Sequence, residues 1–384
     1  MPLDKILGRG EYVMGVCNAC RYCEQYCPVF PAMEQRVSFA VADLTYLANL
    51  CHNCGECLYA CQYAPPHEFG INVPQTLAEI RLRSHEECCW PAFLGAAFRH
   101  NSLATGLGLA TGFTALLLAA TLTMNAEGFW RTSPAGDFYG VVPHAAMVGL
   151  FGGVGLFVLA ALGMGLRRFW RVVQGGPVGT PERPAFATMR PDGRFGAAGP
   201  SPVAARRALR DVLTLRHLHT TGVDCTSGEE TRSPWRRWFH HCTMYGFLLC
   251  FASTSVAAIY DGVFGWRAPY AYTSLPVLLG TVGGLGLLIG PAGLLALRRQ
   301  RDPALGDAAQ KGLDEAFIAL LFVTSLTGVA LLVLRNQAAM GALLVVHLGA
   351  VLALFVTLPY GKFVHGIYRT AALVKYASER SCGG

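Results

Sequence analysis

Two short stretches near the N-terminus decide the fold of this 384-residue chain: CNACRYCEQYCP at residues 17–28 and CHNCGECLYAC at residues 51–61. Each stretch carries four cysteines with the spacing Cys-x2-Cys-x2-Cys-x3-Cys. Three thiolates in one tight turn with a fourth further along suit a 4Fe–4S cluster, and Pro28 after the fourth cysteine belongs to the bacterial ferredoxin pattern. The spacing therefore predicts two 4Fe–4S clusters in one N-terminal domain.

The fourth cysteine of each run is expected to bind the cluster of the other run, as in two-cluster ferredoxins. This rule assigns one cluster to Cys17, Cys20, Cys23 and Cys61, and the other to Cys27, Cys51, Cys54 and Cys57. The second run departs from the pattern because Gln62, rather than proline, follows Cys61. A structural zinc site would leave the third cysteine of each triple unused. A disulfide framework belongs to small secreted chains, and this N-terminus does not resemble a signal peptide.

The segment between the two runs has a helical pattern. Within residues 33–50 the apolar side chains fall at positions 37, 41, 44, 47 and 50, without strand-like alternation. The module resembles the helical two-cluster ferredoxin domain of the iron–sulfur subunits of succinate dehydrogenases and heterodisulfide reductases.

The rest of the chain has the composition of a membrane protein. Hydrophobic residues make up 53% of the chain and charged residues only 14%, and the hydrophobic excess begins after residue 102. A bilayer crossing needs about 20 apolar residues. Six runs qualify: 103–124, 141–166, 243–260, 273–297, 316–334 and 341–361. We therefore predict an all-α protein with a helical two-cluster ferredoxin-like domain at residues 1–100, then a six-helix transmembrane bundle at residues 101–384 with a long loop at residues 167–242.

The positive charges predict the orientation in the membrane. Six crossings bring both termini to one side, and of the 31 Lys and Arg residues only Arg131, Arg267 and Arg335 lie in the three loops on the other side. By the positive-inside rule, both termini and both clusters are cytoplasmic, in a bacterial inner membrane. The net charge of +7 follows from this topology and is not interpreted as nucleic-acid binding.

Five histidines in or near the apolar runs are candidate haem ligands. His144 and His347 lie near the outer ends of their runs, whereas His240, His241 and His365 lie near the inner ends. His347 and His365 are expected on a single helix, five turns apart on one face and separated by about 27 Å. This pattern predicts one or two b haems held by paired imidazoles, with His144 and His347 favoured if there is only one. The alternative is that these histidines are merely interfacial. No Cys-x2-Cys-His occurs, so covalent c-type attachment is not expected.

We do not expect a site for substrate oxidation in this chain. The sequence has no unit of a strand, a Gly-rich turn and a helix, which is the unit that binds flavin or nicotinamide. A separate flavoprotein is therefore the expected electron partner. Five aromatic rings at residues 260–272, beside Asp261 and Arg267, frame a quinone head group or form an ordinary interfacial belt.

Three further segments have structural interpretations. The vicinal pair Cys88 and Cys89 matches no known ligand spacing, and neither do Cys225, Cys242, Cys250 and Cys382. Residues 175–203 are rich in Gly and Pro and are expected to be a linker. Residues 203–219 read as an amphipathic helix that lies on the membrane or packs under the cluster domain.

The sequence also carries a resemblance that covers nearly its full length. The double cysteine motif, RRWFHHCTMYGF at 236–247 and GWRAPY at 265–270 resemble the tricarballylate (citrate) utilisation protein B family. The resemblance implies a membrane protein that reoxidises the FAD of a cytoplasmic tricarballylate dehydrogenase, which makes cis-aconitate, and passes electrons through two clusters and haem to membrane quinone. One alternative is a quinol-oxidising anchor for a cytoplasmic reductase of the heterodisulfide or nitrate type. The other is a redox sensor that regulates a transporter domain, although no broken charged helix or internal repeat is present.

Overall fold

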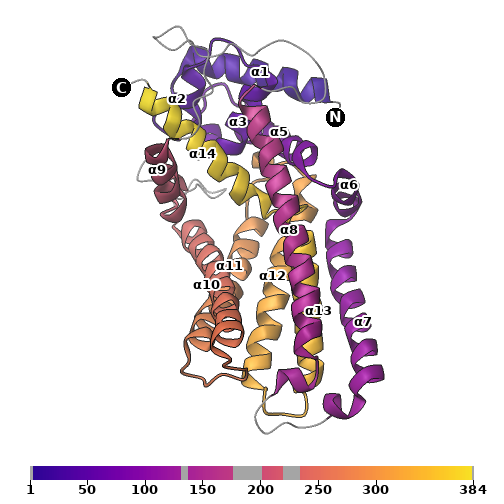
Figure 1. The fold of residues 1–384 in the computed structure, drawn as a ribbon. Coiled ribbons are helices and arrows are strands. Elements are labelled where there is room, and N and C mark those ends of the chain that lie inside the picture. Colours follow the sequence, from indigo (N-terminus) through magenta and orange to yellow (C-terminus); the bar gives the residue numbers. More distant parts are fainter. Residues whose placement is uncertain (1–2, 131–136, 176–200, 219–233, 383–384) are drawn as a thin grey trace.

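The computed structural model describes residues 3–130, 137–175, 201–218 and 234–382, and in these segments the chain is helical without strands (Figure 1). The all-α prediction is thus confirmed for the described residues. The helices of the N-terminal part are α1 (Leu3–Cys20), α2 (Val29–Glu34), α3 (Val41–Leu50), α4 (Glu56–Tyr59), α5 (Val73–Cys88) and α6 (Ala92–His100). The later helices are α7 (Ser102–Trp130), α8 (His144–Val173), α9 (Pro202–Leu213), α10 (Trp235–Phe264), α11 (Leu275–Arg299), α12 (Gln310–Val333), α13 (Met340–Thr357) and α14 (Val364–Cys382). Short 3₁₀ turns lie at Phe138–Gly140, Arg216–Leu218 and Pro303–Leu305.

The N-terminal domain is built on the contact of α1 and α3 with α5. Met14 and Leu47 are completely buried between these helices, and Leu77 of α5 joins them. At Gly10 of α1 a side chain would meet Ile80 Cδ1 at 2.7 Å, so glycine permits the close approach of α1 to α5. These helices share one apolar core with the end of α8, with α9 and with α14, and cysteines of both motifs pack beside it.

The C-terminal helix α14 completes this domain (Figure 1). Its Tyr368 is 2% exposed and stacks on Phe169 of α8, with ring centroids 4.6 Å apart. Helix α9 packs against α14. Of the two positions left open for the segment 203–219, the structure therefore has the helix under the cluster domain. Of the expected linker 175–203, residues 176–200 lie outside the described residues.

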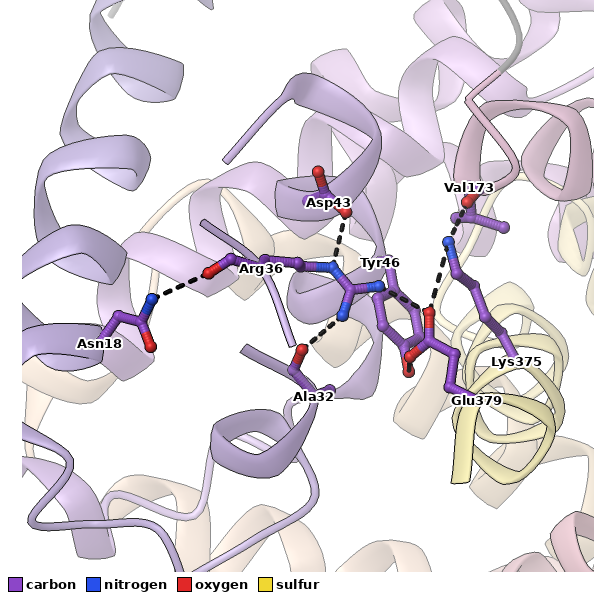
Figure 2. A network of polar contacts seen from close by, with 8 residues as sticks. All are labelled: Asn18, Ala32, Arg36, Asp43, Tyr46, Val173, Lys375 and Glu379. Atoms are coloured by element: carbon purple, nitrogen blue, oxygen red, sulfur yellow. Dashed lines mark hydrogen bonds and ion pairs between the residues drawn. The ribbon is translucent and has the colours of Figure 1, made fainter. Parts of the chain in front are cut away.

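A polar network ties α14 to the loop after the first cysteine motif (Figure 2). The guanidinium of Arg36 donates to Asp43 at 2.6 Å and to Glu379 of α14 at 2.7 Å, and Tyr46 donates to the other oxygen of Glu379 at 3.0 Å. Lys375 donates to the carbonyl of Val173, at the end of α8. Segments more than 300 residues apart in the sequence thus meet at one ionic cluster.

Six helices are long and apolar enough to cross a membrane, which confirms the predicted number within the described residues. They are α7 as far as Glu127, α8, α10, α11, α12 and α13. Helices α10 and α11 approach most closely through small residues: a side chain at Gly283 would meet the backbone nitrogen of Cys250 at 2.8 Å. Glycine at such a position lets two backbones touch inside lipid.

His347 and His365 do not share one helix, which corrects the expectation for the apolar run 341–361 and its continuation to His365. Helix α13 ends at Thr357 and α14 begins at Val364, with turns between them. Leu358 keeps helical backbone angles, and the break follows at Pro359 and Gly361. Proline has no backbone N–H to donate to the preceding turn, and glycine weakens a helix. His347 and His365 therefore lie on different helices, and the separation of five turns on one face does not apply.

Candidate functional site

The first set of cysteines gathers where α1 ends. Cys17 and Cys20 lie in the last turn of α1, and Arg21 directly after it has a positive φ of 53°, which turns the chain towards Cys23. Burial, followed by the neighbouring Cys61, Cys23 and Cys20, raises the pKa of Cys17 to about 12. Cys61 of the second run therefore lies beside the first triple.

The second set of cysteines combines the second triple with Cys27, the fourth cysteine of the first run. Gly55 follows Cys54 as Arg21 follows Cys20, and it also has a positive φ, of 95°. Burial holds the pKa of Cys27 well above its ordinary value, and Cys54 and then Cys51 add to the effect. Burial acts likewise on Cys57, followed by Cys54, Cys27 and Cys51. Cys61 thus lies near the first triple and Cys27 near the second, and Cys23 also acts on Cys57, so the two sets are adjacent. The crossed ligand assignment stays a prediction.

The chemistry of these donors fits a cationic cluster. Four mutually close thiols disfavour one another's ionisation, whereas a bound metal centre stabilises the thiolate form. Among the described residues, no group of three or more His, Cys, Asp or Glu side chains is arranged to hold a single metal ion. Each cysteine set is instead four thiols drawn from two turns of the chain.

Arginines surround the loop that carries the second set. Arg369 of α14 donates to the carbonyl of Leu50 at 3.1 Å, and Arg81 of α5 donates to that of Cys51 at 2.7 Å. Arg236 of α10 donates to the carbonyls of His52 and Asn53 at 3.1 and 3.0 Å, and Arg301, just after α11, also donates to Asn53. Charge counting along the sequence attributed these side chains to membrane topology alone. The one local signal was Arg81, a charge on the buried face of a helix.

A large cavity of about 2220 Å³ begins at this loop and extends between the helices. His52 and Cys54 line it beside the second set, and His240 of α10 and His365 of α14 line it within the helical bundle. Further lining residues come from α8, α9, α11 and α12. The cavity therefore joins the cysteine domain to the inner part of the bundle.

His240 and His365 are the two sequence-predicted haem ligands that line this cavity. The Nδ1 atom of His365 is buried and has no hydrogen-bond partner. Burial, followed by the charge of Lys362, holds the pKa of His365 well below its ordinary value, so the ring is neutral and has a free lone pair. A neutral imidazole is the form that coordinates metal. These residues therefore fit a haem, for which the cavity is large enough.

The remaining three predicted histidines have other neighbours. His241 stacks on Tyr245 at 5.6 Å and does not line the cavity. His144, at the first residue of α8, is half exposed and pairs with Asp261 at 2.7 Å. The Nδ1 atom of His241 is buried without a hydrogen-bond partner, as is that of His365, but its ring is not at the cavity.

His347 packs against α12. Its Nδ1 is 3.1 Å from the hydroxyl of Thr327, and a side chain at Gly328 would meet its Cε1 at 2.9 Å. The ring thus lies flat against a glycine of the neighbouring helix. The structure thus places His240 and His365 at the cavity, whereas His144 and His347, the pair that the sequence favoured, have the other contacts described.

The aromatic hairpin at residues 260–272 packs largely upon itself. The ring of Tyr260 contacts those of Trp266 and Tyr270, with centroids 5.0 and 5.7 Å apart. Arg335 lies 3.6 Å from the centroid of Tyr272 and donates to the carbonyl of Tyr270. These contacts favour a structural role for the hairpin.

The vicinal cysteines also have structural surroundings. Cys88 and Cys89 are 2% and 4% exposed, and Arg168 donates to the carbonyl of Cys89 at 2.8 Å. Among the other four cysteines, Cys242 and Cys250 lie in α10 as free thiols. Cys225 and the side chain of Cys382 lie outside the described residues.

These features define a class: a multi-pass helical membrane protein that carries a two-motif, iron–sulfur type domain at one end. Comparison with known proteins makes the assignment specific. A family model described as Citrate utilization protein B matches residues 99–384, and one described as its Fer4-like domain matches residues 11–87. Citrate utilization protein B of Escherichia coli is 48% identical over 375 residues, which cover 97% of this chain and 92% of that protein. The chain belongs to the citrate utilization protein B family. No solved structure matches it.

Proposed function

We propose that this chain is a membrane electron-transfer protein that links a cytoplasmic FAD-dependent dehydrogenase, of the tricarballylate type, to membrane quinone. The observation that carries the proposal is the cavity that has Cys54 and His52 at one end and His240 and His365 along its walls. The family's Fer4-like domain and its association with citrate utilisation support the same role.

The chain's own residues supply the ligands. The two crossed cysteine sets would hold two 4Fe–4S clusters, and His240 with His365 would hold one b haem. When bound, each of these groups accepts and releases one electron at a time. The cationic side chains of Arg236 and Lys362 at the cavity wall suit the carboxylates of a haem.

The orientation is part of the proposal. Both termini lie at the end of the bundle that carries the cysteine domain (Figure 1), and nearly all Lys and Arg residues belong to the loops at that end. This asymmetry supports a cytoplasmic cysteine domain in a bacterial inner membrane. A soluble flavoprotein would then deliver electrons at the cytoplasmic face, and quinone would collect them within the bilayer.

The proposal is tested by counting cofactors in the full chain purified in detergent. We expect about eight non-haem irons and eight sulfides per chain, together with a b-haem reduced-minus-oxidised spectrum. His240→Ala and His365→Ala should each lose the haem spectrum but keep the iron. His144→Ala and His347→Ala, the matched controls, should keep both. Eight irons without haem would remove the haem part of the proposal, and an iron-free chain would overturn it.

The crossing of the two cysteine runs has its own test. Cys27→Ser should abolish the electron paramagnetic resonance signal of the second cluster and spare that of the first, although Cys27 belongs to the first run. Cys61→Ser should do the reverse. If each substitution instead removed the cluster of its own run, the crossed assignment would be wrong.

A further inference from the structure

The two cysteine sets differ in the charges around them. The loop that carries the second set, Leu50–Asn53, receives hydrogen bonds from four guanidinium groups that come from four separate parts of the chain: Arg81, Arg236, Arg301 and Arg369. Arg81 is 3% exposed. Cys51 acts electrostatically on Arg81 and Arg369, and Cys27 and Cys54 act on Arg369 as well. The positive charge therefore reaches the thiols themselves as well as the loop carbonyls.

The first set has a different environment. The charged side chain that acts on Cys23 is an anion, Glu56, which adds to the effects of burial and of Cys61 and Cys20. The cation nearest in sequence, Arg21, is exposed and donates to the carbonyl of Asn18. Water and salt screen an exposed charge of this kind much more strongly than a buried one.

These charges bear on reduction because an iron–sulfur cluster gains one negative charge when it accepts an electron. Neighbouring cations stabilise the reduced form and raise the reduction potential, whereas neighbouring anions lower it. Burial alone works in the opposite direction, because it disfavours the additional negative charge. At the second set, four guanidinium groups oppose that penalty, and arginine stays protonated at neutral pH.

We infer that the four arginines make the second cluster the better electron acceptor, so that electrons pass from the first set to the second and then into the membrane bundle. This inference rests on the proposed function and adds to it the order in which the two clusters receive the electron. In each step one electron leaves the first centre and one enters the second, without any bond made or proton moved. A reduced flavin of the partner would supply the electron, and a haem held by His240 and His365 would accept it. A chain that delivers electrons from quinol to a soluble reductase would gain nothing from this order.

The inference is tested by a redox titration of the purified full chain, followed by electron paramagnetic resonance. The signal lost in Cys27→Ser identifies the second cluster. We expect that cluster to be reduced at a higher potential than the first. Arg301 lies outside the helices, so the variant Arg301→Gln should fold. We expect this variant to lower the reduction potential of the second cluster and to leave that of the first cluster unchanged. A tenfold shift in the reduced-to-oxidised ratio corresponds to 59 mV for a one-electron couple.

Two variants separate the charge from a purely structural role. Arg301→Lys keeps the charge and should retain most of the potential, whereas Arg21→Gln at the first set should leave the second potential unchanged. If the first cluster were reduced at the higher potential, or if the potential of the second cluster did not change in Arg301→Gln, the inference would be overturned. The proposed function would stand in either case. The absence of both cluster signals from iron-loaded protein would overturn it together with the proposed function.

Discussion

Removal of the Arg36 guanidinium should release the C-terminal helix from the cluster domain. Arg36 lies between Asp43 and Glu379 (Figure 2), and the three side chains are only 10%, 22% and 18% exposed. Arg36→Ala leaves two carboxylates facing each other without their shared cation. Breaking a fully buried pair in this way costs about 3–5 kcal/mol. The residual exposure, and Lys375 at 4.0 Å from Glu379, reduce our expectation to about 2–3 kcal/mol.

Hydrogen–deuterium exchange of the full chain in detergent measures this free energy locally. A loss of about 2–3 kcal/mol corresponds to a fall of roughly 30- to 150-fold in the protection of the amides of α14. The matched control is Arg83→Ala, which removes a pair with Glu86 in which the arginine is 39% exposed. That change should cost no more than about 0.5 kcal/mol.

A double-mutant cycle decides whether the network acts as a unit. Arg36→Ala combined with Glu379→Gln should cost less than the sum of the two single changes, by about 1 kcal/mol or more. If Arg36→Ala lowered the protection of α14 no more than Arg83→Ala does, the claim that this network anchors the helix would be refuted.

Two further predictions concern packing and pH. Gly283→Val should destabilise the bundle by about 1–3 kcal/mol in a thermal melt in detergent, because the new side chain would meet the backbone of Cys250. The control Gly108→Val faces open space and should have little effect. Equal melting temperatures for the two variants would contradict the close contact of α10 with α11. Burial, followed by Arg81 and Lys362, holds the pKa of His85 well below 6.5, so the folded state keeps this ring neutral while the unfolded chain binds a proton below pH 6.5. The free energy of unfolding should therefore fall as the pH is lowered below 6.5, by up to about 2 kcal/mol at pH 5. In urea titrations at several pH values, His85→Gln should reduce this pH dependence, whereas the exposed His100→Gln should not.

Local sequence patterns predicted the elements of this protein well. The cysteine spacing and the apolar lengths are properties of neighbouring residues, so they predicted two cysteine motifs and six crossings without knowledge of any partner. The crossed grouping of Cys27 and Cys61 also followed from a rule about local motifs. Pro359 and Gly361 were a sufficient local signal for the break before α14, but the apolar composition of the run concealed it.

Contacts between distant segments could be read only from the tertiary structure. Nothing near Arg369 in the sequence indicates that it reaches the carbonyl of Leu50, and nothing near Glu379 indicates that it meets Arg36. Similarly, His240 and His241 are adjacent in sequence, and only the rotation of α10 within the bundle decides which of them lines the cavity. Composition and spacing determine which helices form and which ligands they carry. Packing decides which charges surround a ligand, because the neighbours of a buried group come from every helix that closes around it.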